Sequence, residues 1–132
     1  MTTRRATCTC GQLGVDCEGD PVRVSVCHCL PCQQRTGSAF GVQARFARAQ
    51  VRFFGAATTF QRTGDSGGTA TFRFCPQCGS TVYWEHDAFP GFVTVAVGAF
   101  ADPNFPAPKV SVYEVRRHFW ALAPDLDIEH ID

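Results

Sequence analysis

The stretch Cys75-Pro76-Gln77-Cys78-Gly79-Ser80 is the most specific structural signal in this chain. In a Cys-Pro-x-Cys-Gly sequence the proline fixes φ at the first bend, and the glycine permits a tight or left-handed backbone at the end, so both sulfurs point toward one spot. Such a knuckle supplies two ligands, whereas a structural zinc site needs four in a closed tetrahedron. The sequence therefore predicts a zinc site whose remaining ligands come from another part of the chain.

Two further cysteine clusters can complete the knuckle, an amino-terminal one at Cys8-Thr9-Cys10 and a central one at Cys27-His28-Cys29-Leu30-Pro31-Cys32. If the amino-terminal pair joins the knuckle, the three central cysteines remain as ligands of a second ion with one open position. If Cys29 and Cys32 join it instead, three thiols stay unused, and the gap far exceeds the roughly 15 to 20 residues usual in a zinc ribbon. Counting favours the first division, but spacing alone leaves the partners open.

Composition limits the classes of partner. Twelve Lys and Arg balance twelve Asp and Glu, so the chain has no broad basic field for nucleic acid or an anionic membrane. Seven of the eight cysteines are clustered, unlike the dispersed cysteines of a disulfide framework, which indicates metal binding in a reducing compartment. We expect zinc, no nucleic-acid partner and no membrane partner.

The location of the protein in the cell and its number of domains are predicted from its apolar segments and its length. Arg4 and Arg5 lead into residues 6–9 without the apolar run of a secretory signal, and the mainly apolar residues 92–100 are too few for a membrane helix. We therefore expect a cytoplasmic protein with a single domain over residues 1–132.

Hydrophobic residues alternate with a period of two along most of the chain, which is typical of strands with one buried face. Helical turns are expected only at residues 30–36 and 116–122, so we predict a mainly β fold of short antiparallel sheets with one or two helical turns. Cys17 continues the face of Leu13 and Val15 and is predicted to be a buried small hydrophobic residue. Four arginines alternate with apolar strand residues and are predicted to lie on solvated faces: Arg23, Arg45, Arg52 and Arg73.

Four ordered motifs make the chain resemble the glutathione-dependent formaldehyde-activating enzymes and the related centromere protein V group, from about residue 7 to about residue 127. The motifs are Cys8-Thr9-Cys10-Gly11, the central cluster followed by Thr36-Gly37-Ser38-Ala39-Phe40, Arg62-Thr63-Gly64-Asp65-Ser66-Gly67, and Phe74-Cys75-Pro76-Gln77-Cys78-Gly79-Ser80. The resemblance implies a β-tent zinc fold with two zinc ions. It implies a structural zinc on Cys8, Cys10, Cys75 and Cys78, and a functional zinc on Cys27, Cys29 and Cys32.

Three thiolates around Zn²⁺ leave a net charge of −1, so the site is a weaker Lewis acid than a site of neutral histidines and suits a thiol as fourth ligand better than water. The resemblance implies that glutathione binds there and adds to a small aldehyde, formaldehyde, giving S-hydroxymethylglutathione. The reverse reaction makes the protein a carbon-sulfur lyase, with Cys27, Cys29 and Cys32 as the catalytic residues. The alternative is a non-catalytic zinc module that carries glutathione or binds a protein partner.

Polar residues near the central cluster complete the expected site. Arg35, Thr36 and Ser38 are predicted to bind the carboxylates of glutathione, or else to form a solvated turn. His28 lies between two cysteines, and in an extended segment its side chain points away from theirs, so we expect it to donate or accept a hydrogen bond rather than to bind metal. A redox role of the Cys29–Cys32 pair is disfavoured because the βαβ context of that motif is missing.

Overall fold

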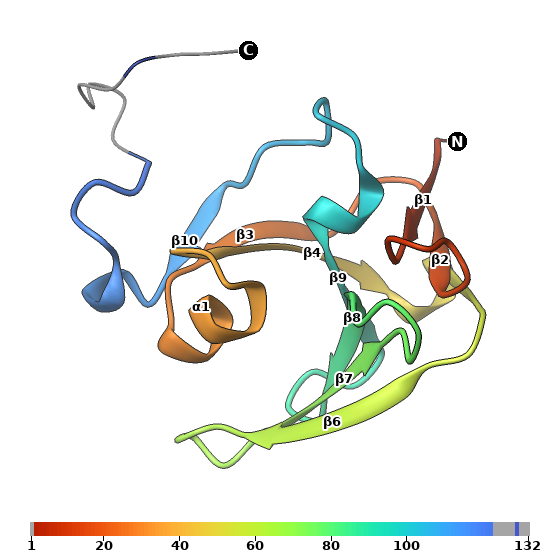
Figure 1. Ribbon diagram of the computed structural model, residues 1–132, viewed down its shortest axis with the longest axis horizontal. Helices are drawn as coiled ribbons and strands as arrows, with labels where there is room; N and C mark the ends of the chain where they lie inside the picture. Colours follow the sequence, from red (N-terminus) through yellow and green to blue (C-terminus); the bar gives the residue numbers. More distant parts are fainter. Residues whose placement is uncertain (1, 123–128, 130–132) are drawn as a thin grey trace.

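Hydrogen bonds between strands divide the molecule into a small and a large sheet (Figure 1). The computed structural model describes residues 2–122 and 129. The strands within these residues are β1 (Thr3–Thr7), β2 (Gly14–Glu18), β3 (Arg23–Cys27), β4 (Gly41–Ala47), β5 (Val51–Phe54), β6 (Thr58–Thr63), β7 (Thr69–Phe74), β8 (Thr81–His86), β9 (Phe92–Ala96) and β10 (Val110–Val112). The small sheet has the order β1-β2-β5, and the large sheet has the order β10-β3-β4-β9-β8-β7-β6.

The mainly β class is confirmed, with one difference in strand direction. The consecutive pairs β1–β2, β3–β4 and β6–β7 are antiparallel, as expected of short hairpin-linked strands. Strand β10 instead runs parallel to β3 at the edge of the large sheet. The segment before β10 returns along β3, where the Lys109 N–H donates to the Val24 carbonyl at 3.1 Å and the His28 N–H donates to the Val112 carbonyl at 3.0 Å.

The main hydrophobic core lies between the two sheets. Leu13, Val15 and Cys17 from the small sheet side pack with Ala44 and other alternating residues of the large sheet. The prediction for Cys17 is confirmed, because it is fully buried and burial raises the pKa of its thiol to about 12. Val22 alternates in the sequence with Val24 and Val26 of β3, but it precedes the strand and is 55% exposed.

The predicted helical turn at residues 30–36 is helix α1 (Leu30–Thr36), which is confirmed. Cys29 caps its first turn, Pro31 lies in that turn, and Gly37 ends the helix at φ 67° with its N–H bonded to the Gln33 carbonyl. Residues 116–122 do not form the second helical turn. Instead a short 3-10 helix, η3, occupies Glu114–Arg116, and the Ala121 N–H bonds to the His118 carbonyl.

The prediction that the four strand arginines are exposed to solvent holds for only one of them. Arg52 on β5 is exposed, whereas Arg23, Arg45 and Arg73 are half-buried. The face of the large sheet that carries Trp84 is also covered in part, because Arg35 of α1 packs on Trp84 and Arg45 packs on Phe89. Side chains that alternate away from the core are therefore still partly covered.

None of the helices in the described part of the chain has the length and apolar character that crossing a membrane requires.

Phe46 and Phe60 offer a matched test of the core, because Phe46 is fully buried and Phe60 on the edge strand β6 is 60% exposed. We expect Phe46→Ala to lower the free energy of unfolding by about 3–5 kcal/mol. Phe60→Ala should change it by less than about 1 kcal/mol, as is usual at the surface. Chemical denaturation of the two variants measures the difference, and equal losses would contradict this placement of the core.

Candidate functional site

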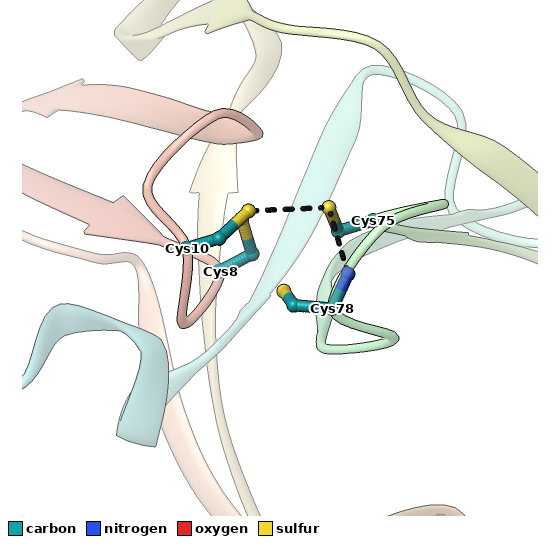
Figure 2. Close-up of side chains that lie close together, drawn as sticks. All are labelled: Cys8, Cys10, Cys75 and Cys78. Atoms are coloured by element: carbon teal, nitrogen blue, oxygen red, sulfur yellow. Dashed lines mark hydrogen bonds between the residues drawn. The ribbon is translucent and has the colours of Figure 1, made fainter.

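Four sulfurs gather where the small sheet meets the large one. Cys8 and Cys10 lie in the loop between β1 and β2, while Cys75 and Cys78 lie in the turn between β7 and β8 (Figure 2). The four Sγ atoms lie within 4.8 Å of one another, and Cys10 Sγ is 3.6 Å from the Sγ atoms of both Cys8 and Cys75. Segments separated by 65 residues thus share one cluster.

The knuckle has the local geometry that its sequence predicts. The backbone N–H groups of Gln77 and Cys78 point at Cys75 Sγ, at 3.4 Å and 3.5 Å, and Gly79 has a φ of +80°. The Gln12 side-chain amide donates to the same sulfur at 3.1 Å. Such donors stabilise a thiolate. No local pattern in the sequence indicates the role of Gln12, because its contact joins the β1–β2 loop to the knuckle.

The four sulfurs fit a tetrahedral metal ion. A zinc–sulfur distance of about 2.3 Å places the sulfurs of a regular tetrahedron about 3.8 Å apart, close to the 3.6 Å separations in the cluster. Hydrogen bonds from the backbone of Ser80 and then Cys10 lower the pKa of Cys78 to about 5. The thiolate, which is the form that binds metals, is therefore favoured there at neutral pH.

The three central cysteines form a second cluster around the start of α1. Cys27 ends β3, Cys29 caps the helix and Cys32 lies in its first turn, and their Sγ atoms are within 4.8 Å of one another. The Cys32 N–H donates to Cys29 Sγ at 3.3 Å. Cys27 and Cys32 are buried, while Cys29 is partly exposed. A metal ion held by these sulfurs would have three protein ligands, of which only Cys29 is partly exposed.

The central sulfurs favour a shared negative charge. A hydrogen bond from Cys27, together with the nearby Arg35 guanidinium, lowers the pKa of Cys32 to about 5 against the opposing effect of burial. The same contact raises the pKa of Cys27, and burial raises it further. One proton therefore leaves this cluster readily and the next leaves with difficulty, so a cation is needed to hold all three sulfurs as thiolates.

His28 does not join the central cluster. Its fully buried ring points toward β10, where Nε2 lies 3.1 Å from Ser111 Oγ. The predicted hydrogen-bonding role is confirmed. The fourth position at the three sulfurs is consequently not filled by this histidine.

A cavity of about 690 Å³ lies between α1 and the four-sulfur cluster. Arg35 and Thr36 line one wall, and Cys8, Thr9 and Ser80 line another. The structure thus brings two of the three predicted substrate-binding residues to one cavity whose far wall belongs to the other cluster.

Ser38 lies apart from that cavity. It lines a separate groove with His118 and Trp120. The Thr36 hydroxyl is already engaged, because it donates to the Cys32 carbonyl at 2.9 Å and accepts from the Ser38 N–H at 3.1 Å.

The guanidinium of Arg35 stacks on an aromatic ring and has two buried nitrogens without a hydrogen-bond partner. Its guanidinium carbon lies 4.4 Å from the ring centre of Trp84, and both Nε and Nη2 are buried without a hydrogen-bond partner. A Cβ atom at Gly41 would come within 2.9 Å of Nη2, so the glycine leaves room for the guanidinium. Sequence reasoning missed Trp84 and Gly41, since both look like ordinary strand residues until the helix is placed over the sheet.

The two clusters can be separated by substitution. We expect Cys75→Ser to reduce tightly bound metal by one ion per chain and to lower the melting temperature, because metal-binding free energy contributes to folding. Cys17→Ala should leave the metal content unchanged, since Cys17 Sγ belongs to neither cluster. Metal analysis of the two purified variants measures this, and an unchanged metal content in Cys75→Ser would contradict the four-sulfur site.

Comparison with known proteins agrees with this architecture. A family model described as "Glutathione-dependent formaldehyde-activating enzyme" matches residues 3–116. A crystal structure of a Rhodobacter sphaeroides protein superimposes with a TM-score of 0.60 at 21% identity, covering 81% of this chain and 98% of that one, which supports the fold. No curated protein matches the chain. Because the family match spans most of the sequence and both cysteine clusters, the chain belongs to the family of glutathione-dependent formaldehyde-activating enzymes.

Proposed function

We propose that both cysteine clusters bind zinc, with a structural ion on the four sulfurs and a functional ion on the three. Thiolate ligands select soft or borderline metals such as zinc over calcium or magnesium. Four ligands make a closed site, while three leave a position for a substrate. The partial exposure of Cys29 beside two buried cysteines supports this assignment of the open position to the central cluster.

We propose further that the central site binds glutathione or a related small thiol and acts as a carbon-sulfur lyase on its formaldehyde adduct. The observation that carries this proposal is the guanidinium of Arg35, which lies beside the three sulfurs, lines a large cavity and has two N–H groups, Nε and Nη2, without a hydrogen-bond partner. A zinc ion bound there supplies a soft electrophilic position at which a thiol loses its proton. Arg35 can bind a carboxylate of the same molecule through charge-assisted hydrogen bonds.

In the synthetic direction the glutathione sulfur forms a bond to the carbonyl carbon of formaldehyde. The C=O double bond becomes a C–O single bond, and the proton lost by the thiol is balanced by one gained at that oxygen, giving S-hydroxymethylglutathione. No oxidant or reductant is needed. Cys27, Cys29 and Cys32 fix the position of the reacting sulfur, and Arg35 with the Thr36 wall orients the molecule, so the protein contributes mainly proximity and orientation. Ser38 would act from the neighbouring groove, on a part of the ligand that extends past the helix.

We also propose the cellular location, the class of partner and the domain organisation of the protein. We place the protein in the cytoplasm, where thiols stay reduced and glutathione is the obvious thiol. The formal charge of zero argues against a nucleic-acid partner. Residues of both sheets contribute to the main core, which supports a single domain over residues 1–132.

Native mass spectrometry with and without glutathione tests the thiol site. We expect two zinc ions in the wild type and a glutathione adduct that disappears in Cys29→Ser, because the open position lies at that cysteine. Cys17→Ser serves as the control and should retain both the ions and the adduct. A single zinc ion in the wild type, or an adduct that forms equally well in Cys29→Ser, would contradict the open-site assignment.

One observation favours the alternative of a glutathione carrier. In the part of the chain that the structure describes, the cavity lining contains neither a carboxylate nor an imidazole that could transfer a proton. NMR exchange between hydrated formaldehyde and its glutathione adduct separates the two functions. We expect the zinc-loaded protein to accelerate exchange and Cys29→Ser to leave it at the uncatalysed rate; binding without acceleration would support the carrier.

A further inference from the structure

A strip of polar residues leads away from the central cysteine cluster along the large sheet. The register of β3 and β4 pairs Cys27 with Gly41, and then places two polar pairs on the same face at successive steps along the strands. We call these the polar strip; its residues are Ser25 opposite Gln43, and Arg23 opposite Arg45. The intervening residues Val24 and Ala44 point the other way, into the main core.

The two arginines of the polar strip have no acidic partner. The ion pairs within the described residues involve Arg4, Arg5, Arg73 and His86, and none involves Arg23 or Arg45. Like charges directly opposite each other on neighbouring strands are destabilising. Partial burial, and next the charge of Arg23, lower the pKa of Arg45. The fold therefore holds two half-buried positive charges side by side without a counterion.

The hydrogen-bonding groups of the polar strip are also incomplete. Arg23 Nε and Gln43 Oε1 are buried and have no hydrogen-bond partner. The Arg45 guanidinium stacks on Phe89, with its carbon 4.4 Å from the ring centre, which fixes its position without using its N–H donors. Buried donors without partners, such as Arg23 Nε, are rare and costly in folded proteins. A carboxylate would supply both a counterion for the two arginines and an acceptor for Arg23 Nε, whereas Gln43 Oε1 is itself an acceptor and would not bind it.

Elsewhere in the fold a half-buried arginine is compensated. Arg73 on β7 reaches Glu85 on β8, with its Nη2 3.4 Å from the carboxylate oxygen. The sheet thus supplies an acidic partner to Arg73 but, among the described residues, none to Arg23 or Arg45.

The distance from the cluster suits a ligand of peptide size. Arg23 and Cys27 are four positions apart on β3, which corresponds to about 13 Å along the strand. In an extended tripeptide with its thiol on the middle residue, one arm spans about 7 Å, and the long arginine side chains can cover the remaining distance. A ligand whose thiol is held at the central cluster can therefore place one carboxylate at the polar strip and another at Arg35.

We propose that Arg23 and Arg45 form a carboxylate-binding subsite for one arm of the thiol ligand. The subsite makes the protein selective for thiols that carry a carboxylate on an extended arm. The thiol half of this statement rests on the proposed function, whereas the carboxylate half depends only on the arginines.

Thiol selectivity tests the subsite. Binding of glutathione and of 2-mercaptoethanol to the zinc-loaded protein is measured by calorimetry in the wild type, Arg23→Gln and Arg45→Gln. We expect either substitution to weaken glutathione about ten- to a hundred-fold, the value of a charge-assisted hydrogen bond, and to leave 2-mercaptoethanol unchanged. The exposed Arg52→Gln is the matched control, and Arg23→Lys should retain part of the affinity because it keeps the charge. Equal affinities for glutathione across the variants would overturn the subsite.

S-methylglutathione separates this proposal from the thiol function, because it keeps both carboxylates but has no free thiol. NMR saturation transfer should detect its binding to the wild type and its loss in the Arg23→Gln, Arg45→Gln double variant. The melting temperature and metal content of that variant verify its folding. Arginine-dependent binding of S-methylglutathione supports the subsite even if glutathione never reaches the cysteines, in which case only the proposed function fails. The subsite is overturned if S-methylglutathione binds the double variant as well as the wild type, or if it binds neither protein.

Discussion

The contact between the β1–β2 loop and the knuckle brings together four sulfurs that lie too close to be ionised all at once without a cation. At Sγ–Sγ separations of 3.6 Å, neighbouring thiolates repel each other strongly. A tetrahedral metal ion, as proposed, would remove this repulsion and bind all four sulfurs. It would then join the two sheets across 65 residues, a closure that otherwise costs considerable chain entropy. The core between the sheets can then assemble on a fixed frame.

The same junction determines the shape of the candidate substrate cavity. One wall comes from α1, which places Arg35 and Thr36, and another comes from the four-sulfur cluster, which places Thr9 and Ser80. The hydroxyls of Thr9 and Ser80 lie 2.8 Å apart and link the loop to the knuckle directly. In this member of the glutathione-dependent formaldehyde-activating enzyme family, the four-sulfur cluster and the helix that carries Cys32 therefore share the walls of one cavity.

Local features were predictable from the sequence, and long-range ones were not. The knuckle and the bounds of α1 follow from residues such as Pro31 and Gly37, whose backbone preferences act within a few positions. The burial of Cys17 follows from alternation. The parallel pairing of β10 with β3 joins segments that are far apart in the sequence, and no local sequence pattern predicts it.

The candidate site shows the same division. The cysteines can be identified from their spacing in the sequence. The contact of Arg35 with Trp84, by contrast, depends on how α1 packs on the sheet. Arg23 and Arg45 alternate with apolar residues as solvated arginines do, and only the strand register reveals that they face each other beside the central cluster. Which residues face each other across two strands depends on the strand register, and the register depends on the whole fold.

The 65 residues between the two halves of the four-sulfur cluster also set an order of events during synthesis. At about 5–20 residues per second, the knuckle leaves the ribosome roughly 3 to 13 seconds after the amino-terminal pair. The three central cysteines lie within six consecutive positions and are complete much earlier. If both clusters bind metal as proposed, the central cluster would be able to bind its ion first, while Cys8 and Cys10 remain free thiols until the knuckle has been synthesised. The supply of metal during synthesis, and not only its affinity for the finished protein, would then influence how much of this chain reaches the native state.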